Sequence, residues 1–588
     1  MQTAQPPKPH PLYDIIILGA SGFTGKYVVK EALKFLNTPS SPLKTLALAG
    51  RSREKLVKTL QWAAHPSSPP NDVSVITADT TDPPSLSSLC NQTKLLLNCV
   101  GPYRIHGEPV VAACASSGCD YLDITGEPEF MEKMEAKYHE KAMETGSLIV
   151  SACGFDSIPA EMGVMFNMRQ WVAPAVPNHV TAYVSLESDK RIVGNFATYE
   201  SAVLGVANMD KLQQLRRSRP KKPRPVIFKN SMVPLLDLVS DLILLQAITF
   251  FVAVSRGDAT SICSCTYIDY NSSVLLMTKA WAWLKDGDSK PRAWWLQYYL
   301  PTLQYYSPHI GCEKIYIVLF LSVASIGRGI LVPEADMMLG HPDLFKPLLQ
   351  TMMIAIPGPR LPKGPTIEYQ EKIGLRALKL PSADAVVVRR TFVTLMENPH
   401  GLPGINESPE HIGKREAYWS SVKPAHFVVK IASKSLLGIY RILGVGVFIG
   451  LLCRFSFGRW LLLKFPSFFS FGWFRKTGPS EDEVRSASFK MWFVGYGFSD
   501  CNLASERNSK PDMEIITRVM GPEIGYVTTP ISLIQCALIV LSQRENLPKG
   551  GVYTPGIVFG PDLQERLQEN GISFDVVSKT ALPSSAPA

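Results

Sequence analysis

Residues 13–25, YDIIILGASGFTG, join a short β-branched apolar run to a turn that contains three glycines. The run at 13–18 is typical of a strand that is buried on both faces. Residues 26–37 then carry apolar side chains at helical spacing, so the stretch predicts a strand, a glycine-rich turn and a helix in that order. A glycine-rich turn in this position is a candidate dinucleotide-binding loop.

Each glycine has its own expected role in that loop. Gly19 makes the tight turn, Gly22 lets the backbone approach a diphosphate, and Gly25 lets the helix pack on the strand. The helix amino end adds unpaired N–H groups and the positive end of the helix dipole. The spacing is GxxGxxG rather than GxGxxG, so a purely structural turn is the alternative. The predicted cofactor-binding residues of the loop are Gly19, Ser21, Gly22, Phe23, Thr24 and Gly25.

The end of the second predicted strand, residues 45–49, indicates which dinucleotide binds. In NAD-binding folds an acidic residue at this place holds the ribose 2′-hydroxyl. Arg51 and Ser52 stand there instead. A guanidinium forms charge-assisted, bidentate hydrogen bonds with a 2′-phosphate. The sequence therefore favours NADP over NAD, and the alternative is that Arg51 is a solvated surface residue.

Further strand–helix units predict a parallel sheet. Strands are expected at 73–78, 94–100, 120–123 and 147–152, and helices at 109–117 and 129–145. Open parallel sheets bind ligands at the carboxyl ends of their strands. The residues that we expect beside the cofactor at these ends are Asp79, Asn98, Val100 and Gly101. The alternative role for Asp79 is to cap the next helix. Asn98 and Tyr103 are candidates to contact the nicotinamide ribose, and the alternative for Tyr103 is that it belongs to a lid.

Several motifs in the first 160 residues resemble those of one family. They are GASGFTG (19–25), LAGRS (48–52), NCVGPY (98–103), YLDITGE (121–127) and CGFDSIP (153–159). Together they resemble the saccharopine dehydrogenase-like oxidoreductases, and most closely the eukaryotic branch that is distantly related to bacterial trans-acting enoyl reductases of glycolipid synthesis. The resemblance implies an NADP domain of Rossmann type and a second domain that precedes the return of the chain to the nucleotide domain.

The predicted fold class is α/β, with a Rossmann-type parallel sheet and a second α/β or α+β domain that has a mixed or antiparallel sheet. The expected domains are 1–160 for NADP binding, 161–227 and 356–529 for the second domain, and 530–588 for the return to the nucleotide domain. Strands are expected at 180–187, 489–497, 513–520 and 575–577, and helices at 194–212 and 530–543. The turn GGVYTP at 550–555 resembles a family turn on the cofactor side, although a structural turn is as good an interpretation.

Residues 228–355 form an insertion that the resemblance does not lead us to expect. Basic, Pro-rich segments at 216–227 and 357–365 flank it and look like halves of one loop. Its apolar runs of 14 and 13 residues are shorter than the ~20 residues of a bilayer span. The interpretations are a membrane-contacting insertion, a poorly ordered segment, or translated non-coding sequence. The last is favoured, because its removal restores a continuous loop.

A second hydrophobic pattern occupies residues 434–474. Residues 442–453 are uncharged and too few to cross a bilayer, and residues 455–474 hold seven phenylalanines and two tryptophans. Aromatic rings interleaved with cations suit a lipid–water interface. We expect this segment to attach the protein to a membrane or lipid droplet. The alternatives are a helix pair buried in a core or homodimer interface and, least favoured, a membrane span. The cations are Arg454, Arg459 and Lys464.

Composition excludes other classes of protein. The 588 residues carry a net charge of +9, and hydrophobic and charged fractions of 46% and 19% exclude a disordered or coiled-coil chain. The sequence contains no stripe of Lys and Arg interleaved with aromatic residues, the pattern that indicates nucleic-acid binding. The eleven cysteines form no CxxC pairs, so neither a metal site nor a disulfide framework is expected. The amino terminus has no apolar run, so we expect an intracellular protein that is not secreted.

The expected function is hydride transfer by an NADP-dependent oxidoreductase acting on a lipid-linked substrate at a lipid droplet, mitochondrial or other membrane surface, in glycolipid or lipid metabolism. The alternatives are a saccharopine-type amino-acid oxidoreductase and a non-catalytic lipid-surface protein that keeps the dinucleotide fold. A small dicarboxylate should meet several arginines. No acid–base set is forced by the sequence, so the proton donors considered are Tyr103, Asp156 and water.

Overall fold

The computed structural model describes residues 11–218, 365–505 and 509–582. The insertion inferred at 228–355 lies outside the described residues, as does the rest of the segment from residue 219 to residue 364. The interpretations of that insertion therefore stay predictions.

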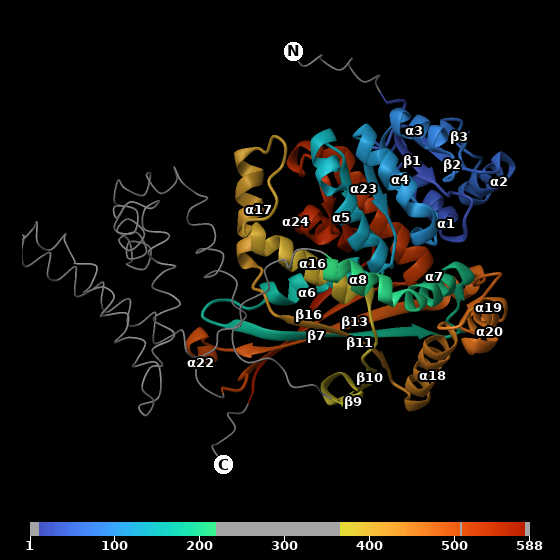
Figure 1. The fold of residues 1–588 in the computed structure, drawn as a ribbon. Coiled ribbons are helices and arrows are strands. Elements are labelled where there is room, and N and C mark those ends of the chain that lie inside the picture. The colour runs from blue at the N-terminus through green and yellow to red at the C-terminus, as the bar shows by residue number, and fades with distance from the viewer. Residues whose placement is uncertain (1–10, 219–364, 506–508, 583–588) are drawn as a thin grey trace, which may run out of the picture. The chain divides into compact units, whose positions relative to one another are not determined.

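A seven-stranded sheet forms the nucleotide domain, with strand order β15-β6-β5-β4-β1-β2-β3 and every pairing parallel (Figure 1). Its strands are β1 (Tyr13–Leu18), β2 (Leu46–Gly50), β3 (Val73–Thr77), β4 (Thr93–Asn98), β5 (Asp120–Asp123), β6 (Leu148–Val150) and β15 (Gly551–Tyr553). The interior strand β1 is buried on both faces, as its apolar residues 15–18 predict. The Rossmann-type parallel sheet is thus confirmed.

The helices of this domain are α1 (Phe23–Leu33), α2 (Arg53–Ala64), α3 (Pro83–Gln92), α4 (Tyr103–Ser117), α5 (Pro128–Thr145), α23 (Thr529–Gln543) and α24 (Pro555–Glu569). Helices α1 to α5 connect strands of the parallel sheet, whereas α23 and α24 lie before and after its last strand, β15. The helical stretch Ile524–Asn546, which includes α23, is long and apolar enough to cross a bilayer, but 78% of its most apolar 18 residues are buried inside the protein. Because α23 packs against α1, β4 and β5, we interpret it as a core helix.

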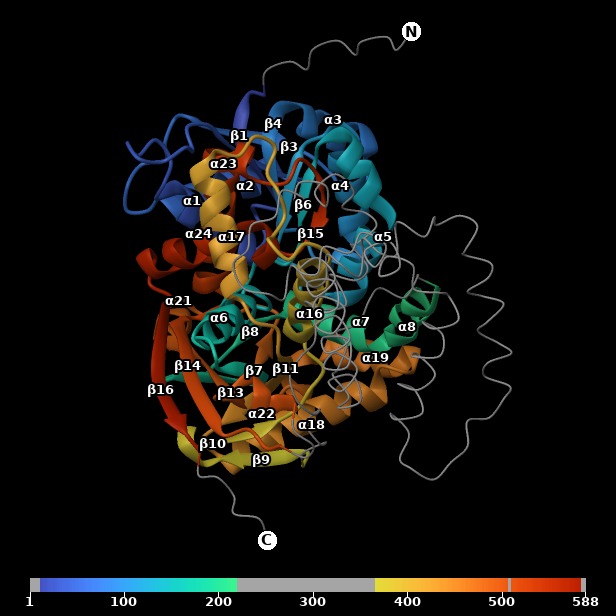
Figure 2. The ribbon, with the colours of Figure 1, turned by 90° about the vertical axis from the view of Figure 1, so that its left-hand side faces the viewer.

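The second domain is built on a mixed sheet of order β16-β14-β13-β7-β11-β10-β9. Its strands are β7 (Val176–Ser188), β9 (Ile367–Gln370), β10 (Leu375–Leu378), β11 (His426–Ser433), β13 (Ala487–Phe498), β14 (Met513–Pro522) and β16 (Ser573–Ala581). Only β7 and β11 pair in parallel; the other neighbours are antiparallel. Helix α6 (Ile158–Arg169) packs on β13 and β14, and Figure 2 shows β16, β14 and β13 side by side.

The remaining elements lie around this sheet. Their bounds are β8 (Gly194–Asn195), α7 (Phe196–Ala207), α8 (Met209–Ser218), α16 (Ala383–Glu397), α17 (Pro409–Ser421), α18 (Leu436–Leu452), α19 (Ser456–Lys464), α20 (Pro466–Phe469), β12 (Phe474–Arg475), α21 (Glu481–Ser486) and α22 (Cys501–Ser505).

Several helices begin or end where the sequence did not indicate. Helix α1 begins at Phe23, and α4 begins at Tyr103 rather than at residue 109. The Glu127 carboxylate accepts hydrogen bonds from the backbone N–H groups of Tyr103 (2.9 Å) and Arg104 (3.0 Å), so a distant residue caps α4. The helix expected at 194–212 is two helices that meet at Asn208, where the backbone leaves the helical conformation.

The last strand corrects one predicted domain boundary. The edge strand expected at 575–577 exists as β16, but it pairs with β14 of the mixed sheet. The return to the nucleotide domain therefore ends with α24. Ten residues of β14 need an antiparallel partner on that side, and β16 supplies the hydrogen bonds.

Candidate functional site

The glycine loop between β1 and α1 is shaped by close backbone packing. Gly19 has a φ of +80°, and a Cβ on Gly25 would lie 2.2 Å from the Gly19 carbonyl oxygen. A Cβ on Gly22 would meet only that same oxygen, at 3.1 Å. No side chain caps the amino end of α1, so its first N–H groups are available to an anion. This cradle fits the diphosphate of a dinucleotide.

The side chains of the glycine loop differ in their burial and in their contacts. Ser21 and Thr24 are half-buried. The ring of Phe23 packs edge-on against Tyr526 at 4.9 Å between centroids, and a Cβ on Gly478 would lie 2.5 Å from it. The Phe23 ring therefore fixes the loop against the second domain, and its backbone N–H is the group that would be available to a cofactor.

The end of β2 presents a cation. Arg51 is exposed and forms no ion pair with the other described residues. The Ser52 hydroxyl accepts a hydrogen bond from the N–H of Lys55 and caps α2. Asp79 accepts hydrogen bonds at 2.9 Å from the N–H and hydroxyl of Thr81, which lower its pKa, and the nearby Arg51 charge lowers it further. Asp79 thus shapes the turn before α3, whose cap is Asp82.

Replacing Arg51 by Ala should weaken NADPH binding about 10- to 100-fold and leave NADH binding unchanged, because a charge-assisted pair with the 2′-phosphate contributes roughly 1.5–3 kcal/mol. Isothermal titration with both nucleotides measures this. Lys58→Ala is the control, since Lys58 is an exposed cation on the following helix, α2, and pairs with Glu54 at 3.0 Å. An equal loss for both nucleotides would contradict a role in recognising the 2′-phosphate.

The structure does not support cofactor contacts by the side chains of Asn98 and Tyr103. Asn98 is fully buried; its Oδ1 accepts the N–H of Val100 (3.0 Å) and its Nδ2 donates to the Tyr121 hydroxyl (3.1 Å). The buried Tyr103 hydroxyl donates to the Asn98 carbonyl oxygen (2.7 Å), so Tyr103 is neither a lid residue nor a free proton donor. Burial raises its pKa well above the usual value. These groups instead shape the loop in which Val100 packs on Gly19 and Gly101 is exposed.

The loops after β5 and β6 are held together by Asp123. Its Oδ1 accepts the N–H groups of Thr125 (3.0 Å) and Ala152 (2.8 Å), and its Oδ2 accepts the Tyr121 hydroxyl (2.9 Å). Burial raises the pKa of Asp123 to about 6 in spite of these bonds. Because both loops leave the carboxyl ends of neighbouring strands, Asp123 fixes the floor of the expected nicotinamide site.

Asp156 lies over the loop after β5. A Cβ on Gly126 would be 2.5 Å from Oδ2 of Asp156, so the carboxyl covers the backbone of the loop after β5. Part of the side chain reaches solvent, but the surrounding protein desolvates the carboxyl and raises its pKa. Asp156 thus stays a candidate proton donor.

A second carboxyl, Asp384, lies in the first turn of α16, whose Ala383 and Val387 pack with Ala152 of the loop after β6. Oδ2 of Asp384 accepts a hydrogen bond from the Ser382 hydroxyl (2.6 Å), and Oδ1 is buried without a hydrogen-bond partner. Burial raises the pKa of Asp384 to about 8, and the charge of Asp156 contributes to the same shift. The sequence reasoning missed Asp384, because no local motif marks it and only the fold brings α16 to the loop after β6.

The arginines that contact α5 are all paired with its carboxylates. Glu129 pairs with Arg104, which lies in the first turn of α4. Glu132 accepts from the Nε of Arg216 on α8 at 3.0 Å, and Glu135 lies 3.2 Å from the Nε of Arg390 on α16. These three guanidinium groups are therefore neutralised within the protein. The pairs are Arg104–Glu129, Arg216–Glu132 and Arg390–Glu135.

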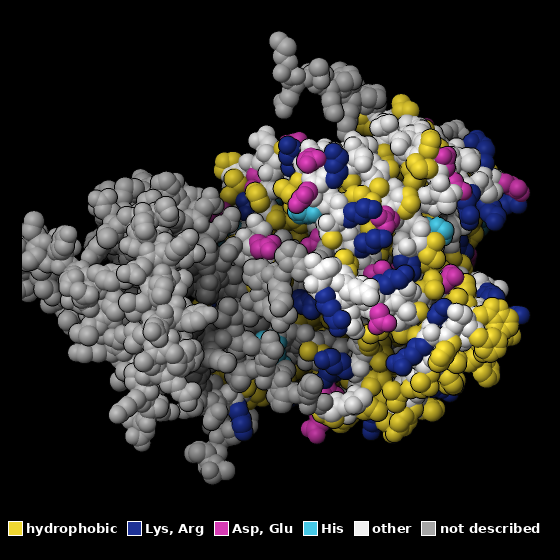
Figure 3. Space-filling view, in the orientation of Figure 1, with side chains coloured by type: hydrophobic (Ala, Val, Ile, Leu, Met, Phe, Trp, Pro, Cys, Tyr) yellow, Lys and Arg dark blue, Asp and Glu magenta, His cyan; other side chains and the backbone are white. Residues whose placement is uncertain are grey.

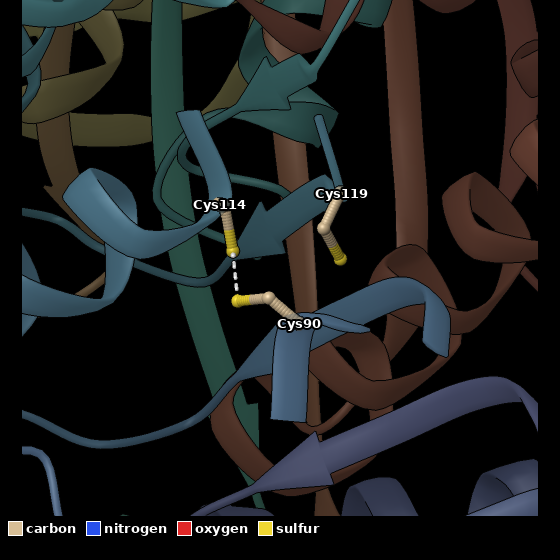
Figure 4. Close-up of side chains that lie close together, drawn as sticks. All are labelled: Cys90, Cys114 and Cys119. Atoms are coloured by element: carbon tan, nitrogen blue, oxygen red, sulfur yellow. Dashed lines mark hydrogen bonds between the residues drawn. The ribbon is translucent and has the colours of Figure 1, made fainter. Parts of the chain in front are cut away.

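Three cysteines that are dispersed in the sequence converge in the core, which their linear spacing did not predict. The thiols of Cys90, Cys114 and Cys119 lie within 4.8 Å of one another, and those of Cys90 and Cys114 are 3.6 Å apart (Figure 4). All three are buried, and Cys119 precedes β5, at the opposite end of the sheet from the glycine loop. Burial raises the pKa of Cys114, and the Cys119 thiol donates to the Asp120 carbonyl oxygen (3.4 Å). Hydrogen bonds with the Cys114 and Cys119 thiols lower the pKa of Cys90 to about 4, so the three form an interacting group of core thiols.

The parallel sheet, the uncapped glycine loop and the arginine at the end of β2 define a dinucleotide-binding domain of the Rossmann type. Residues 15–150 match the family model of the saccharopine dehydrogenase NADP binding domain. The chain is 56% identical over 574 residues to the "Probable mitochondrial saccharopine dehydrogenase-like oxidoreductase" of Arabidopsis thaliana, covering 97% of this chain and 98% of the relative. The chain belongs to the saccharopine dehydrogenase-like oxidoreductase family, and its cofactor is NADP.

Two further relatives carry other names. A Caenorhabditis elegans protein called "Lipid droplet localized protein" is 27% identical over 579 residues, covering 96% of this chain and 99% of that protein. A Mycobacterium bovis "Trans-acting enoyl reductase" is 36% identical over 194 residues, or 32% of this chain and 44% of that protein. The family resemblance drawn from the sequence motifs is confirmed.

Proposed function

We propose that the protein is an NADP-dependent oxidoreductase that acts on a lipid-linked substrate at the surface of a membrane or lipid droplet, in lipid metabolism. Bound NADP(H) would supply or accept the hydride. The observation that carries the proposal is an exposed apolar surface on the same described part of the chain as the NADP domain.

This surface, the apolar platform, is formed by α18, α19, α20 and the residues between them. It contains eleven of the 24 large hydrophobic side chains that are exposed among the described residues, including every exposed Phe and Trp. Figure 3 shows hydrophobic side chains gathered over these helices. A contiguous patch of this kind marks an interaction surface. Its members are Leu436, Leu437, Tyr440, Val447, Leu451, Phe455, Phe457, Trp460, Phe465, Phe468 and Phe471.

The inner side of the platform is packed on the second domain. Tyr199 and Val203 of α7 form a buried cluster with residues of α18 and α19, among them Ile449 and Leu462. The platform is therefore a fixed surface, with one apolar face used in folding and a second left exposed. A helix pair wholly buried in the core of the described chain does not match this exposure.

Cations on the platform suit an anionic lipid surface. Arg454 and Lys464 are exposed, and the Lys464 ammonium lies 4.6 Å from the centroid of the Trp460 ring. Aromatic rings with adjacent basic groups settle at the level of the lipid headgroups. A basic group near an anionic surface contributes ~1 kcal/mol to attachment.

The charges near the expected nicotinamide site disfavour a small dicarboxylate substrate. The three arginines that contact α5 already pair with its glutamates, and Asp156 and Asp384 add carboxyls to the site. A saccharopine-type substrate would bring further carboxylates towards these groups. The names of the lipid-droplet and enoyl-reductase relatives also support a lipid substrate.

The test combines cofactor binding with turnover on vesicle-borne substrates. The purified full chain is titrated with NADPH, and NADPH oxidation is then followed with α,β-unsaturated and keto lipids in phosphatidylcholine–phosphatidylserine vesicles; saccharopine with NADP is assayed in parallel. We expect turnover only with a lipid. Turnover with saccharopine alone would overturn the lipid assignment. NADPH binding without any turnover would favour the non-catalytic lipid-surface alternative.

A further inference from the structure

We propose that Cys90, Cys114 and Cys119 form a binding site for one monovalent copper ion. The site goes beyond the proposed oxidoreductase function, because it lies at the end of the parallel sheet opposite to the glycine loop. The ion joins α3, α4 and the start of β5 and takes no part in hydride transfer.

The first argument is the convergence of three thiols from separate elements. Cys90 comes from the last turn of α3, Cys114 from the last turn of α4, and Cys119 from the residue before β5 (Figure 4). Helices α3 and α4 pack against each other. Among the described residues, this is the one group of three or more Cys, His, Asp or Glu side chains whose ligand atoms lie close enough to share a metal ion.

The distances between the thiols fit an ion that is bound by three sulfur atoms. Metal–thiolate bonds of ~2.3 Å around a trigonal ion place the sulfur atoms ~4 Å apart. The Sγ atoms of Cys90 and Cys114 are 3.6 Å apart, and all three Sγ atoms lie within 4.8 Å of one another. The observed spacing therefore brackets the spacing that such an ion requires.

The backbone holds two of the three ligands together before any ion binds. Gly118, with a φ of +69°, ends α4 in the left-handed conformation and turns the chain back. The N–H groups of Gly118 and Cys119 both donate to the Cys114 carbonyl oxygen, at 3.0 and 3.2 Å. This turn returns Cys119 to the side of Cys114, so the pair needs little reorganisation to bind an ion.

The ligand set favours copper(I) over zinc(II). Structural zinc ions are almost always bound by four ligands in tetrahedral geometry, whereas this group offers three. All three ligands are thiols, and soft thiolate ligands select monovalent copper. The exposed fractions of Cys90, Cys114 and Cys119 are 5%, 0% and 4%, so water has little access as a fourth ligand.

The surroundings of Cys119 also suit a bound cation. Its sulfur lies 3.7, 3.9 and 3.4 Å from the carbonyl oxygens of Thr93, Lys94 and Asp120. These oxygens repel a bare thiolate, so the sulfur is stable there either as a thiol that donates its proton or as the ligand of a cation. Binding breaks the S–H bonds, releases the protons to solvent and forms copper–sulfur bonds, and copper keeps its oxidation state.

The experiment titrates the reduced full chain with copper(I) under anaerobic conditions, in competition with the chelator bathocuproine disulfonate. We expect one copper ion per chain, three sulfur ligands in the X-ray absorption spectrum, and a higher melting temperature, since the ion binds the folded group. Cys90→Ala should bind copper(I) at least ~100-fold more weakly, because loss of a partner outside the ligand shell already costs about 10- to 100-fold.

The matched control is the double variant Cys263→Ala, Cys265→Ala, which removes the two most closely spaced cysteines of the sequence. It should bind copper(I) as the wild type does. NADPH titration checks the fold of Cys90→Ala; if that variant does not fold, the wild-type spectrum and the double variant decide.

Three results would overturn the copper site: no copper(I) retained by the wild type against the chelator, fewer than three sulfur ligands, or loss of copper in the double variant. Equal affinity of the wild type for zinc(II) would overturn the choice of ion. None of these results bears on the proposed function, because NADPH binding and the vesicle assay use the chain without added metal.

Discussion

Gly25→Ala should abolish measurable NADPH binding, with a loss of affinity of more than about 100-fold, and should destabilise the nucleotide domain by roughly 1–3 kcal/mol. The added Cβ would lie 2.2 Å from the Gly19 carbonyl oxygen and 3.1 Å from two backbone atoms of Ala20. All of these are backbone atoms of the loop, so α1 can accept the methyl group only by moving away from β1. That movement displaces the N–H groups that would bind the diphosphate.

Titration with NADPH and thermal melting followed by circular dichroism test this expectation. Gly205→Ala in α7 is the matched control, because a Cβ there meets nothing within 4 Å. The control should bind NADPH normally and be as stable as the wild type or more stable by ~0.5–1 kcal/mol, since Ala replaces Gly in a helix. Wild-type NADPH affinity in Gly25→Ala would show that the loop does not bind the diphosphate.

The second large effect is expected at the apolar platform. The triple variant Phe457→Ser, Trp460→Ser, Phe468→Ser should bind lipid vesicles at least about 100-fold more weakly than the wild type. Burying one large apolar side chain contributes ~1.5–3 kcal/mol, and the three chosen rings are exposed on the outer face. Flotation with anionic vesicles and with triacylglycerol droplets measures the bound fraction.

The matched control removes exposed apolar side chains elsewhere. Val576→Ser with Val577→Ser changes the edge strand β16, which is outside the platform. This variant should float with the lipid as the wild type does. NADPH affinity should be unchanged in both variants, which separates attachment from folding. If the triple variant still floats like the wild type, another surface carries any attachment to lipid.

The parts of the fold that the sequence predicted are those whose signals are local. The apolar run of β1, the glycine spacing and the helical pattern of α1 occupy adjacent residues, and each reports on its own neighbourhood. The class of the second sheet could also be predicted, because long alternating strands such as β13 and β14 carry their own pattern.

The errors concern interactions between distant residues. Asn98 and Tyr103 are polar residues at a strand end, and nothing local shows that Tyr121 and a backbone carbonyl satisfy them in the core. The start of α4 depends on Glu127, whose carboxylate accepts the N–H of Tyr103. Such pairings are set by tertiary packing, so a single sequence gives no signal for them.

The position of β15 has a consequence for how the molecule is made. Residues 551–553 form an edge strand of the NADP-binding sheet. Helix α23 packs on the same sheet next to α1. During synthesis the cofactor domain is therefore incomplete until residue 553 has left the ribosome, and until then β6 forms the edge of its sheet. A genetic fragment ending at residue 160 would lack β15, α23 and α24, so we expect soluble expression of the domain alone to require residues 529–569 as well.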